Sequence, residues 1–421
     1  MNNQKTIVIV GGGAAGIMAA LSVRKHHPQD KIIILDRTFA LGRKILVCGA
    51  GRCNITNINL EHDPAKHYYG ASPDFINSVF EQFAYADISN FFHELGINLY
   101  VEQKKRIGKL FPTTNRADTV TEILYDELEH QRVEVRTNCE VKQITKVNTI
   151  FNLLAYYEGK LLEIKADYVI LAAGGRTYPA LGADGSGYNL ARSLGHNIIE
   201  PVPSALPLEA KNNLSQHLQG IRMELNVSAE INGEIKKSST DEVMFTNYGL
   251  SGPAVLNVSR EISIHLNRNK QIEAYVYLNA FPMLTVKQVN DLLTARWNKK
   301  PNQSVVKSLY GLFPNKVALA YVKESGISET ASSKDISTEQ KEKLIKILTN
   351  YKIKVQATRG WNEAEFTAGG VDTSEVMSTS LQSKLVSGLY FCGEILNVDG
   401  DVGGFNLSWA WSSGHVAGKL Q

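Results

Sequence analysis

The feature that most constrains the fold is the first 36 residues, in which two apolar segments flank a glycine-rich turn. Residues 5–10, KTIVIV, are typical of a strand buried in a parallel sheet, and GGGAAG at 11–16 leads into a segment with helical spacing at 17–27. A second apolar segment, KIIILD, ends at Asp36. This order of strand, glycine turn, helix, strand and acid predicts a dinucleotide-binding βαβ unit.

The glycines of this turn have separate tasks. Gly11 permits the tight turn, Gly13 lets the backbone approach a pyrophosphate, and Gly16 lets the helix pack closely on the strand. Asp36 follows Gly16 by twenty residues, a spacing that suits an acid on the ribose hydroxyls of an adenosine. A glycine turn without a ligand is the alternative, and the complete arrangement favours the ligand. Nicotinamide and flavin enzymes share this motif, so it predicts a dinucleotide without saying which.

Composition excludes several classes of protein. The 421 residues include 45 basic and 42 acidic side chains, a net charge of +3 that does not indicate a nucleic-acid surface. We therefore expect a small-molecule substrate, no nucleic acid and no membrane, and the oligomeric state stays open. Four cysteines make no disulfide framework, and glycines interrupt the apolar run 7–23, so a cytoplasmic protein is expected.

Three later segments favour FAD over a nicotinamide. Residues 167–175, DYVILAAGG, are an apolar strand that ends in small residues, and 389–394, LYFCGE, are another short strand with a glycine and an acid after it. In 399–420, two glycines open a final helix. Distant segments that return to one ligand suggest a long cofactor laid across the sheet, which fits FAD.

The middle of the chain has a different character. Antiparallel strands are predicted over 198–281 and 343–353, and a helical subdomain over 282–342. The expected fold is α/β, with a discontinuous FAD-binding domain at 1–197 and 354–421 interrupted by a β-rich and helical insert at 198–353. A substrate pocket is expected at the junction of the two domains. Within the insert, Ser251 is the expected N-cap of a helix with Pro253 in its first turn.

The motifs together resemble a known family. GGGAAG, GRKILVCGAGRCNITN, AAGGRTYPALGADGSGYNLARSLGH, FTNYGLSGPAVLNVS, FTAGGV and LYFCGEILNVDGDVGGFNLSWAWSSG run from near the first residue to near the last. The chain resembles the bacterial FAD-dependent oxidoreductases with two-dinucleotide-binding-domain-type folds, which include aminoacetone oxidase and a proposed dehydro-bile-acid reductase. The resemblance implies non-covalent FAD and an inserted β-rich and helical domain.

The resemblance also implies a set of cofactor-binding residues. They are Gly11, Gly13, Ala14, Ala15 and Gly16 at the pyrophosphate, Asp36 at the ribose with Arg37 beside it, Arg43 and Lys44 along the phosphates and adenosine, Val141 at the adenine, Ala173 and Gly174 at the middle of the cofactor, and Gly393 and Glu394 at the ribityl and diphosphate. Glu394 stands where related flavoproteins often have Asp. A solvated basic turn is the alternative interpretation of Arg43 and Lys44.

Two further segments are predicted to meet the flavin ring. The N–H groups of Gly403, Gly404, Phe405, Asn406 and Leu407 open the last helix, and they would stabilise negative charge at the pyrimidine edge of the flavin. A simple turn before a packed helix is the alternative. In GAGRCN, we expect Gly51, Arg52 and Asn54 near the isoalloxazine.

Cys48 and Cys53 raise the main alternative function. Flavoprotein disulfide reductases have two cysteines with this spacing soon after the glycine motif. They normally have a second glycine motif for NAD(P)H as well, and GADGSG has its glycines in the wrong order. In addition, the family pattern usually has a small hydroxyl residue in place of Cys48. We therefore interpret the pair as packing residues and any disulfide as incidental.

The resulting prediction is an FAD-dependent oxidoreductase. It would act by hydride transfer on a small molecule, either oxidising an amine or reducing an unsaturated acceptor, with NAD(P)H a candidate transient electron donor. A non-catalytic flavin-binding or tRNA-associated protein is a second alternative. Tyr178 and Phe405 are candidates for the substrate side, and no catalytic residue is predicted. His62 and His67 lack a partner at metal-ligand spacing, so no metal is expected.

Overall fold

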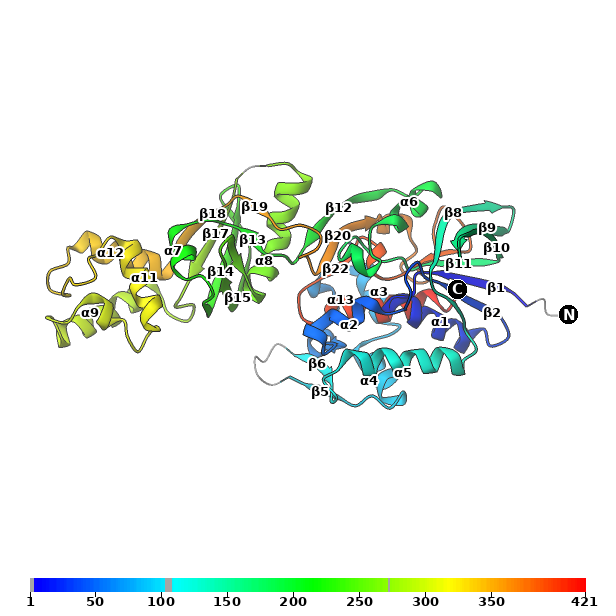
Figure 1. Cartoon of the computed structure of the whole chain (residues 1–421), viewed down its shortest axis with the longest axis horizontal. Helices are drawn as coiled ribbons and strands as arrows, with labels where there is room; N and C mark the ends of the chain where they lie inside the picture. The colour runs from blue at the N-terminus through cyan, green and yellow to red at the C-terminus, as the bar shows by residue number, and fades with distance from the viewer. Residues whose placement is uncertain (1–3, 103–107, 272) are drawn as a thin grey trace. The chain divides into compact units, whose positions relative to one another are not determined.

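The chain forms two compact units in a computed structural model that describes residues 4–102, 108–271 and 273–421 (Figure 1). The first unit comprises Met1–Pro203 and Glu365–Gln421, and the second comprises Ser204–Ala364. Each unit has a hydrophobic core of its own. No described helix combines the length and the apolar composition that a membrane-spanning segment needs.

A five-stranded parallel sheet lies at the centre of the first unit. Its order is β21 (Leu389–Phe391), β11 (Tyr168–Leu171), β1 (Thr6–Val10), β2 (Lys31–Leu35) and β7 (Glu134–Arg136). The central strands are apolar runs because both faces of the sheet are covered. Since the strands are parallel, the segments that follow β1, β2, β11 and β21 meet at one edge, which is where α/β sheets bind ligands.

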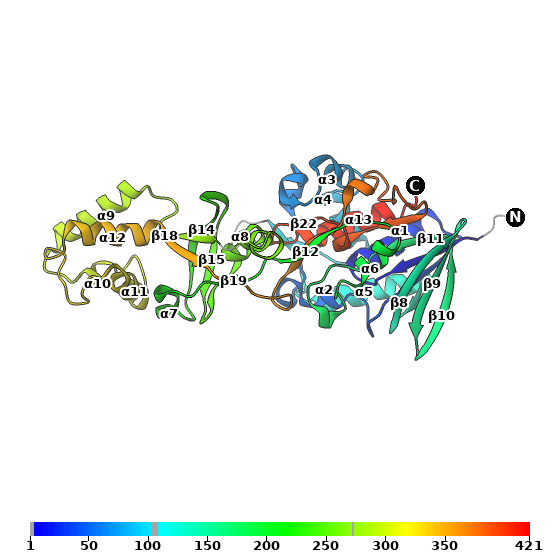
Figure 2. The ribbon, with the colours of Figure 1, turned by 90° about the horizontal axis from the view of Figure 1, so that it is seen from above.

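Smaller sheets and helices surround this sheet. A separate antiparallel layer contains β8 (Cys139–Val147), β9 (Ile150–Tyr157) and β10 (Lys160–Ala166), as Figure 2 shows. The remaining strands of this unit are β3 (Thr56–Asn57), β4 (Tyr68–Tyr69), β5 (Leu99–Val101), β6 (Lys109–Pro112), β12 (Ile198–Ser204), β20 (Phe366–Val371) and β22 (Asp399–Gly400). Its α-helices are α1 (Ala14–His26), α2 (Arg43–Val47), α3 (Pro73–Phe80), α4 (Tyr85–Glu94), α5 (Ala117–His130), α6 (Ser186–Ser193) and α13 (Phe405–Ala417).

Helices α1 and α13 pack unusually closely. A Cβ atom added at Gly414 would lie 2.5 Å from the carbonyl oxygen of Ala15, and one at Gly418 would lie 2.5 Å from that of Ala19. The two glycines, four residues apart on one helix face, therefore let the backbones approach. This packing fixes the start of α13 relative to the glycine turn before α1.

The second unit is built on a seven-stranded antiparallel sheet. Its order is β18 (Tyr351–Val355), β17 (Ala274–Asn279), β14 (Arg222–Ile231), β15 (Glu234–Phe245), β16 (Gly249–Ser251), β13 (Leu208–Glu209) and β19 (Ala357–Thr358). Its helices are α7 (Asn213–His217), α8 (Pro253–Ser263), α9 (Val286–Lys299), α10 (Val305–Ser308), α11 (Asn315–Ser325) and α12 (Thr338–Thr349). Helices α9, α11 and α12 gather at one end of the sheet in both views, and α10 lies with them in Figure 2 (Figures 1 and 2).

Three local expectations differ from the structure. Residues 343–349, predicted as strand, continue α12, whose apolar side chains pack at helical spacing into the core. β18 extends through the expected boundary at 353/354 because it pairs with β17 along its whole length. The N-cap of α8 is Gly252 and not Ser251, which lies in β16. Gly252 has φ +94°, and a Cβ there would lie 2.6 Å from the carbonyl oxygen of Glu242.

Candidate cofactor-binding site

A cavity opens where the parallel strands of the first unit end. The segments after β1, β2 and β11 line it together with the start of α2, β8 and the loop before α6. The predicted residues that line it are Gly11, Gly13, Asp36, Arg37, Arg43, Lys44, Val141, Ala173 and Gly174. Residues that sequence reasoning missed also line it, among them Gly12, Thr38, Gly42, Gly182, Ala183 and Ser186.

Three glycines of the turn differ in the space around them. A Cβ at Gly11 would lie 2.4 Å from the carbonyl oxygen of Ala172, and one at Gly16 would lie 1.9 Å from that of Gly11, whereas Gly13 has nothing within 4 Å. Gly11 and Gly16 are thus needed for packing, and Gly13 leaves open space. No described residue accepts a hydrogen bond from the N–H groups of Gly13, Ala14, Ala15 and Gly16, and the first turn of α1 has no acidic side chain. Such N–H groups suit an anion.

Asp36 closes the turn from the neighbouring strand. Its Oδ2 accepts a hydrogen bond of 2.7 Å from the backbone N–H of Gly12, and its Oδ1 accepts bonds of 2.7 Å from the N–H and the hydroxyl of Thr38. A carboxylate has about four acceptor positions, so capacity remains for a ribose hydroxyl. The side chain is held in place at the edge of the cavity.

The basic side chains of the cavity have protein partners of their own. Arg37 pairs with Asp184, and the guanidinium of Arg43 donates to the carbonyl of Ala180 at 3.0 Å and lies over the ring of Phe39. These contacts orient the two guanidinium groups at the wall of the cavity. Both remain partly exposed, as a group that binds a phosphate must be.

Lys44 and Glu394 form the most buried ion pair of the site. The Nζ of Lys44 lies 2.6 Å from Oε2 of Glu394 and donates to the Thr177 hydroxyl at 3.0 Å. Oε1 of Glu394 accepts from the N–H of Thr367 at 2.8 Å. Burial alone would raise the pKa of Glu394, but Lys44 and the Thr367 hydrogen bonds lower it below its ordinary value. The carboxylate is therefore charged and links β20 and the end of β21 to α2.

The loop after α2 holds a strained backbone. Gly49, Ala50, Gly51 and Cys53 all have positive φ, and for Ala50 (φ +57°) and Cys53 (φ +62°) this is uncommon. Arg52 forms an ion pair of 2.8 Å with Glu102 and lies over the ring of Phe111. Strain of this kind is concentrated at functional sites.

This loop lies against the start of α13. A Cβ at Gly404 would lie 2.7 Å from the carbonyl oxygen of Thr56 and 3.4 Å from that of Asn54, and the side chain of Asn57 donates to the carbonyl of Gly403 at 2.8 Å. No described residue accepts a hydrogen bond from the backbone N–H groups of Gly404, Phe405, Asn406 or Leu407. Donors therefore gather here, as they do at the start of α1.

Most of the predicted residues thus fall into two groups. One lines the cavity, and the other lies in the loop after α2 and at the start of α13. Gly393 belongs to neither group: its N–H donates to Ser413 of α13 at 2.9 Å, and a Cβ there would lie 2.7 Å from the Cβ of Ala15. Ala14, Ala15, Gly16 and Glu394 are likewise not among the residues lining the cavity. The second group contains Gly51, Arg52, Asn54, Gly403, Gly404, Phe405, Asn406 and Leu407, none of which is among the residues lining the cavity. Tyr178, with φ +57°, precedes a short 3-10 helix.

Sequence reasoning missed the partners of His67. Its Nδ1 lies 3.2 Å from Oδ2 of Asp401, a residue 334 positions away, and its ring stacks on Phe405. No local spacing signals this pair. In the part of the chain that the structure describes, no group of three or more His, Cys, Asp or Glu side chains is arranged to hold a metal ion.

Comparison with known proteins identifies the family. The family described as "HI0933-like protein Rossmann domain" matches residues 5–420. The chain belongs to this family. The 3-dehydro-bile acid delta(4,6)-reductase of Clostridium scindens is 34% identical over 413 residues, which cover 98% of each chain. The ribosomal RNA dihydrouridine synthase of Escherichia coli is 31% identical over 409 residues, 96% of this chain and 95% of the other.

A solved structure supports the fold. The 3-ketosteroid-delta4-(5alpha)-dehydrogenase of Rhodococcus jostii RHA1 superposes with a TM-score of 0.52 over 100% of this chain and 97% of the other, at 16% identity. The predicted family of FAD-dependent oxidoreductases, its α/β Rossmann-type fold and the enzyme class are confirmed. The individual cofactor-binding residues and the identity of the substrate stay predictions.

Proposed function

We propose that this member of the HI0933-like family is an FAD-dependent reductase of a carbon–carbon double bond conjugated with a carbonyl group. When bound, FAD supplies two-electron hydride chemistry. The observation that carries the proposal is the cavity at the carboxyl ends of the parallel strands, with Gly13 open, the first N–H groups of α1 unpaired and Asp36 fixed at the edge. These features fit the adenosine diphosphate part of FAD.

Different segments of the protein would bind different parts of the cofactor. The start of α1 would bind the diphosphate, Asp36 the ribose, and Val141 the adenine through its backbone. The unpaired N–H groups at the start of α13 would face the pyrimidine edge of the flavin, where reduction brings negative charge. Glu394 and Lys44 would act by fixing the strand ends, because their charges satisfy each other.

The names of two relatives support reduction over amine oxidation. A delta(4,6)-reductase and a dihydrouridine synthase both yield a ring with fewer double bonds. Steroid dienones and uracil share a double bond conjugated with a carbonyl, which polarises one carbon toward hydride. Amine oxidation has no counterpart in these two names.

The geometry of Cys48 and Cys53 disfavours a disulfide reductase. Both are free thiols, and Cys53 is fully buried. A hydrogen bond with Cys48, together with burial, raises the pKa of Cys53 well above its ordinary value. Because the thiolate is the nucleophile in disulfide exchange, this buried environment disfavours Cys53 in that role. Replacing Cys48 with serine should leave reductase activity unchanged.

The experiment that tests the proposal follows the visible spectrum of the purified protein under anaerobic conditions. NADH and then NADPH are added, with dithionite as the alternative reductant, and the reduced protein is mixed with 4-androstene-3,17-dione or with ribosomal RNA transcribed in vitro. Return of the oxidised flavin spectrum, with product gaining two hydrogens, is the expected result. A reduced protein that neither acceptor reoxidises would contradict the proposal.

Of the two acceptors, RNA is favoured by the distribution of charge. Residues 204–364 contain 21 Lys and Arg against 15 Asp and Glu, a net charge of +6, while the rest of the chain has 24 against 27, a net charge of −3. The net charge of the whole chain, on which the expectation of no nucleic-acid partner rests, averages over this difference between the two units. A basic unit is typical of proteins that bind nucleic acid.

Three exposed lysines of the second unit lie on adjoining segments. Lys299 is the last residue of α9 and Lys300 follows it, and the backbone N–H of Lys334 donates to the carbonyl of Pro301 at 3.2 Å. None of the three forms an ion pair with a described residue. By contrast, Lys287 pairs with Asp291 and Lys323 with Glu329.

Binding of the transcribed RNA at about 50 and about 200 mM salt tests this choice. Substituting Lys299, Lys300 and Lys334 with glutamine should weaken RNA binding. The slope of log K against log salt concentration should also become shallower, by the amount expected for the loss of about three phosphate contacts. The matched control replaces Lys236, Lys287 and Lys323, which are already paired. Equal losses in both triple variants, or binding that does not depend on salt, would favour the steroid-like acceptor.

A further inference from the structure

His67 is held in a fixed orientation by backbone pairing between distant segments. β4 pairs antiparallel with β22, so that Tyr68 lies opposite Gly400 and Tyr69 opposite Asp399. The pairing continues with the N–H of Asp401, which donates to the carbonyl of His67 at 2.9 Å. This register places the side chains of His67 and Asp401 beside each other.

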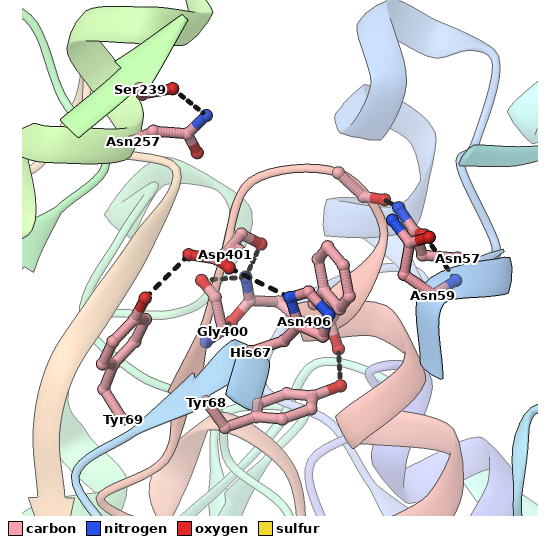
Figure 3. A network of polar contacts seen from close by, with 12 residues as sticks. Asn57, Asn59, His67, Tyr68, Tyr69, Ser239, Asn257, Gly400, Asp401 and Asn406 are labelled. Carbon is pink, nitrogen blue, oxygen red and sulfur yellow. Dashed lines mark hydrogen bonds and ion pairs between the residues drawn. The ribbon is translucent and has the colours of Figure 1, made fainter. Parts of the chain in front are cut away.

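The carboxylate of Asp401 is shared between two side chains, as Figure 3 shows. Its Oδ2 lies 3.2 Å from Nδ1 of His67, and its Oδ1 accepts a hydrogen bond of 3.0 Å from the hydroxyl of Tyr69. The backbone carbonyl of Asp401 accepts from the side chain of Asn406 at 3.3 Å. The acid is thus fixed from several sides and in turn fixes the imidazole.

Phe405 fixes the remaining freedom of the ring. The rings of His67 and Phe405 stack with centroids 4.3 Å apart and an interplanar angle of 22°, and the Phe405 carbonyl accepts from Tyr68 at 2.7 Å. Phe405 is the first residue of α13, whose unpaired N–H groups are the proposed flavin contacts. His67 therefore lies directly against the segment where the reacting part of the cofactor is proposed to sit.

The second ring nitrogen of His67 remains available. No described residue forms a hydrogen bond with Nε2, and the side chain is 21% exposed. His196 is the contrasting case, since its Nδ1 pairs with Glu375, its Nε2 meets the Ser383 hydroxyl, and its side chain has no exposed surface. In a histidine that acts as a general acid or base, a carboxylate commonly holds one ring nitrogen while the other nitrogen is available to the substrate.

We propose that His67, positioned by Asp401 and Tyr69, donates the proton that completes the reduction. The inference rests on the proposed function, and it names a residue that function requires. Reduction of a conjugated double bond adds a hydride to the carbon distant from the carbonyl, which leaves an enolate. The enolate then takes the proton from Nε2–H of the imidazolium, forming a C–H bond at the neighbouring carbon.

The atoms and electrons of this step balance. The hydride carries both electrons: a reduced nicotinamide supplies it whole, whereas dithionite, the other reductant named above, supplies the two electrons and water supplies the hydrogen. The proton that completes the reduction derives from His67. The imidazole is left neutral and regains a proton from water, while the Asp401 carboxylate stays ionised and stabilises the imidazolium. Tyr69 holds the carboxylate and transfers nothing.

The first experiment measures the orientation of the ring without any cofactor. Nitrogen-15 NMR of histidine-labelled protein stripped of flavin reports which ring nitrogen carries the proton in the neutral imidazole. We expect the Nδ1–H tautomer in wild type, because Nδ1 faces the carboxylate, and a shift toward Nε2–H in Asp401→Leu. His67→Gln assigns the signal. A wild-type ring that is mainly Nε2–H would overturn the proposal.

The second experiment measures turnover and chemical rescue. In His67→Ala, kcat for reduction of the probe acceptor should fall by about 100-fold or more, the usual contribution of a general acid, while KM and flavin content stay unchanged. Imidazole added to the solution should restore part of the rate. His62→Ala, an exposed histidine five residues away, is the matched control and should behave as wild type.

The outcomes separate the two proposals. Wild-type turnover that persists in His67→Ala would overturn the role of His67 and leave the reductase proposal standing. A loss of rate without rescue by imidazole, accompanied by a raised KM, would also overturn it, because that pattern indicates only a structural role. No turnover by wild-type protein with either 4-androstene-3,17-dione or the transcribed RNA would overturn both.

Discussion

Lys44 and Glu394 are 350 residues apart in sequence and form an ion pair of 2.6 Å in the wall of the site. Replacing Lys44 with methionine should lower the free energy of unfolding at pH 7 by about 1–3 kcal/mol, because it leaves the carboxylate largely buried without a countercharge. Urea unfolding at pH 7 measures this loss.

The pH dependence of this pair has a definite sign. Because the folded-state pKa of Glu394 lies below its ordinary value of 4.5, the pair stabilises the fold above that pH, and its contribution disappears as the pH falls through the folded-state pKa. The difference between wild type and Lys44→Met should therefore shrink in acid. Lys287→Met, which breaks an exposed pair with Asp291, should leave stability close to that of wild type at every pH.

Asp36→Asn tests the adenosine end of the site. The substitution keeps the shape of the side chain and removes the charge that accepts from Gly12 and Thr38. We expect FAD to bind about 10- to 100-fold more weakly, since hydrogen bonds to a charged acceptor contribute about 1.5–3 kcal/mol. Titration of the stripped protein with FAD, followed by flavin fluorescence, measures the Kd. Asp63→Asn, at an exposed position, is the control, and an equal Kd for both variants would count against the site.

Gly414→Ala tests the close packing of α1 and α13. The added methyl group would lie 2.5 Å from the carbonyl oxygen of Ala15 and 3.1 Å from the Cβ of Met18, so the helices must separate. The expected loss of stability is about 1–3 kcal/mol, typical of overpacking. Gly360→Ala, where nothing lies within 4 Å, should change stability by less than about 1 kcal/mol. A Gly414 variant as stable as the Gly360 variant would show that the helices adapt freely.

The sequence predicted those parts of the site whose signal is local. The unit from β1 to Asp36 is a continuous pattern of apolar segments and glycines. A Cβ would clash at Gly11 and at Gly16, as their predicted roles in the turn and in helix packing require, and the space beside Gly13 is open. The strands that end near Ala173 and Gly393 were predictable in the same way, because each is a short apolar run directly followed by small residues.

Relationships between distant residues left no such signal. Local spacing predicts no partner for His67, because Asp401 is 334 positions away. It predicts none for Lys44, which the resemblance places along the phosphates, because Glu394 is 350 positions away. The prediction of Ser251 as the N-cap of α8 was wrong for a different reason. Residue preference favours Ser251, but the close approach of the Glu242 carbonyl requires glycine at position 252.

The buried side chain of His415 should make the stability of the first unit depend on pH. It lies on α13 with its ring stacked on Phe83, centroids 4.1 Å apart, and burial, with smaller contributions from Lys419, His26 and Lys25, lowers its pKa from 6.5 to about 3. The unfolded chain therefore binds a proton at this residue at a higher pH than the folded chain. Stability should fall as the pH decreases from about 6.5 to about 3, because protonation favours the unfolded state throughout that window.

His415→Gln removes this titration while keeping a polar side chain. Losing the ring stack should lower stability at pH 7 by about 0.5–1.5 kcal/mol, so the informative quantity is the slope of unfolding free energy against pH. Between pH 6.5 and about 3 that slope should be shallower in the variant than in wild type. His62→Gln, an exposed histidine, should leave the slope unchanged. Equal slopes in wild type and His415→Gln would mean that the folded protein accommodates a charged imidazole at the contact between α13 and Phe83.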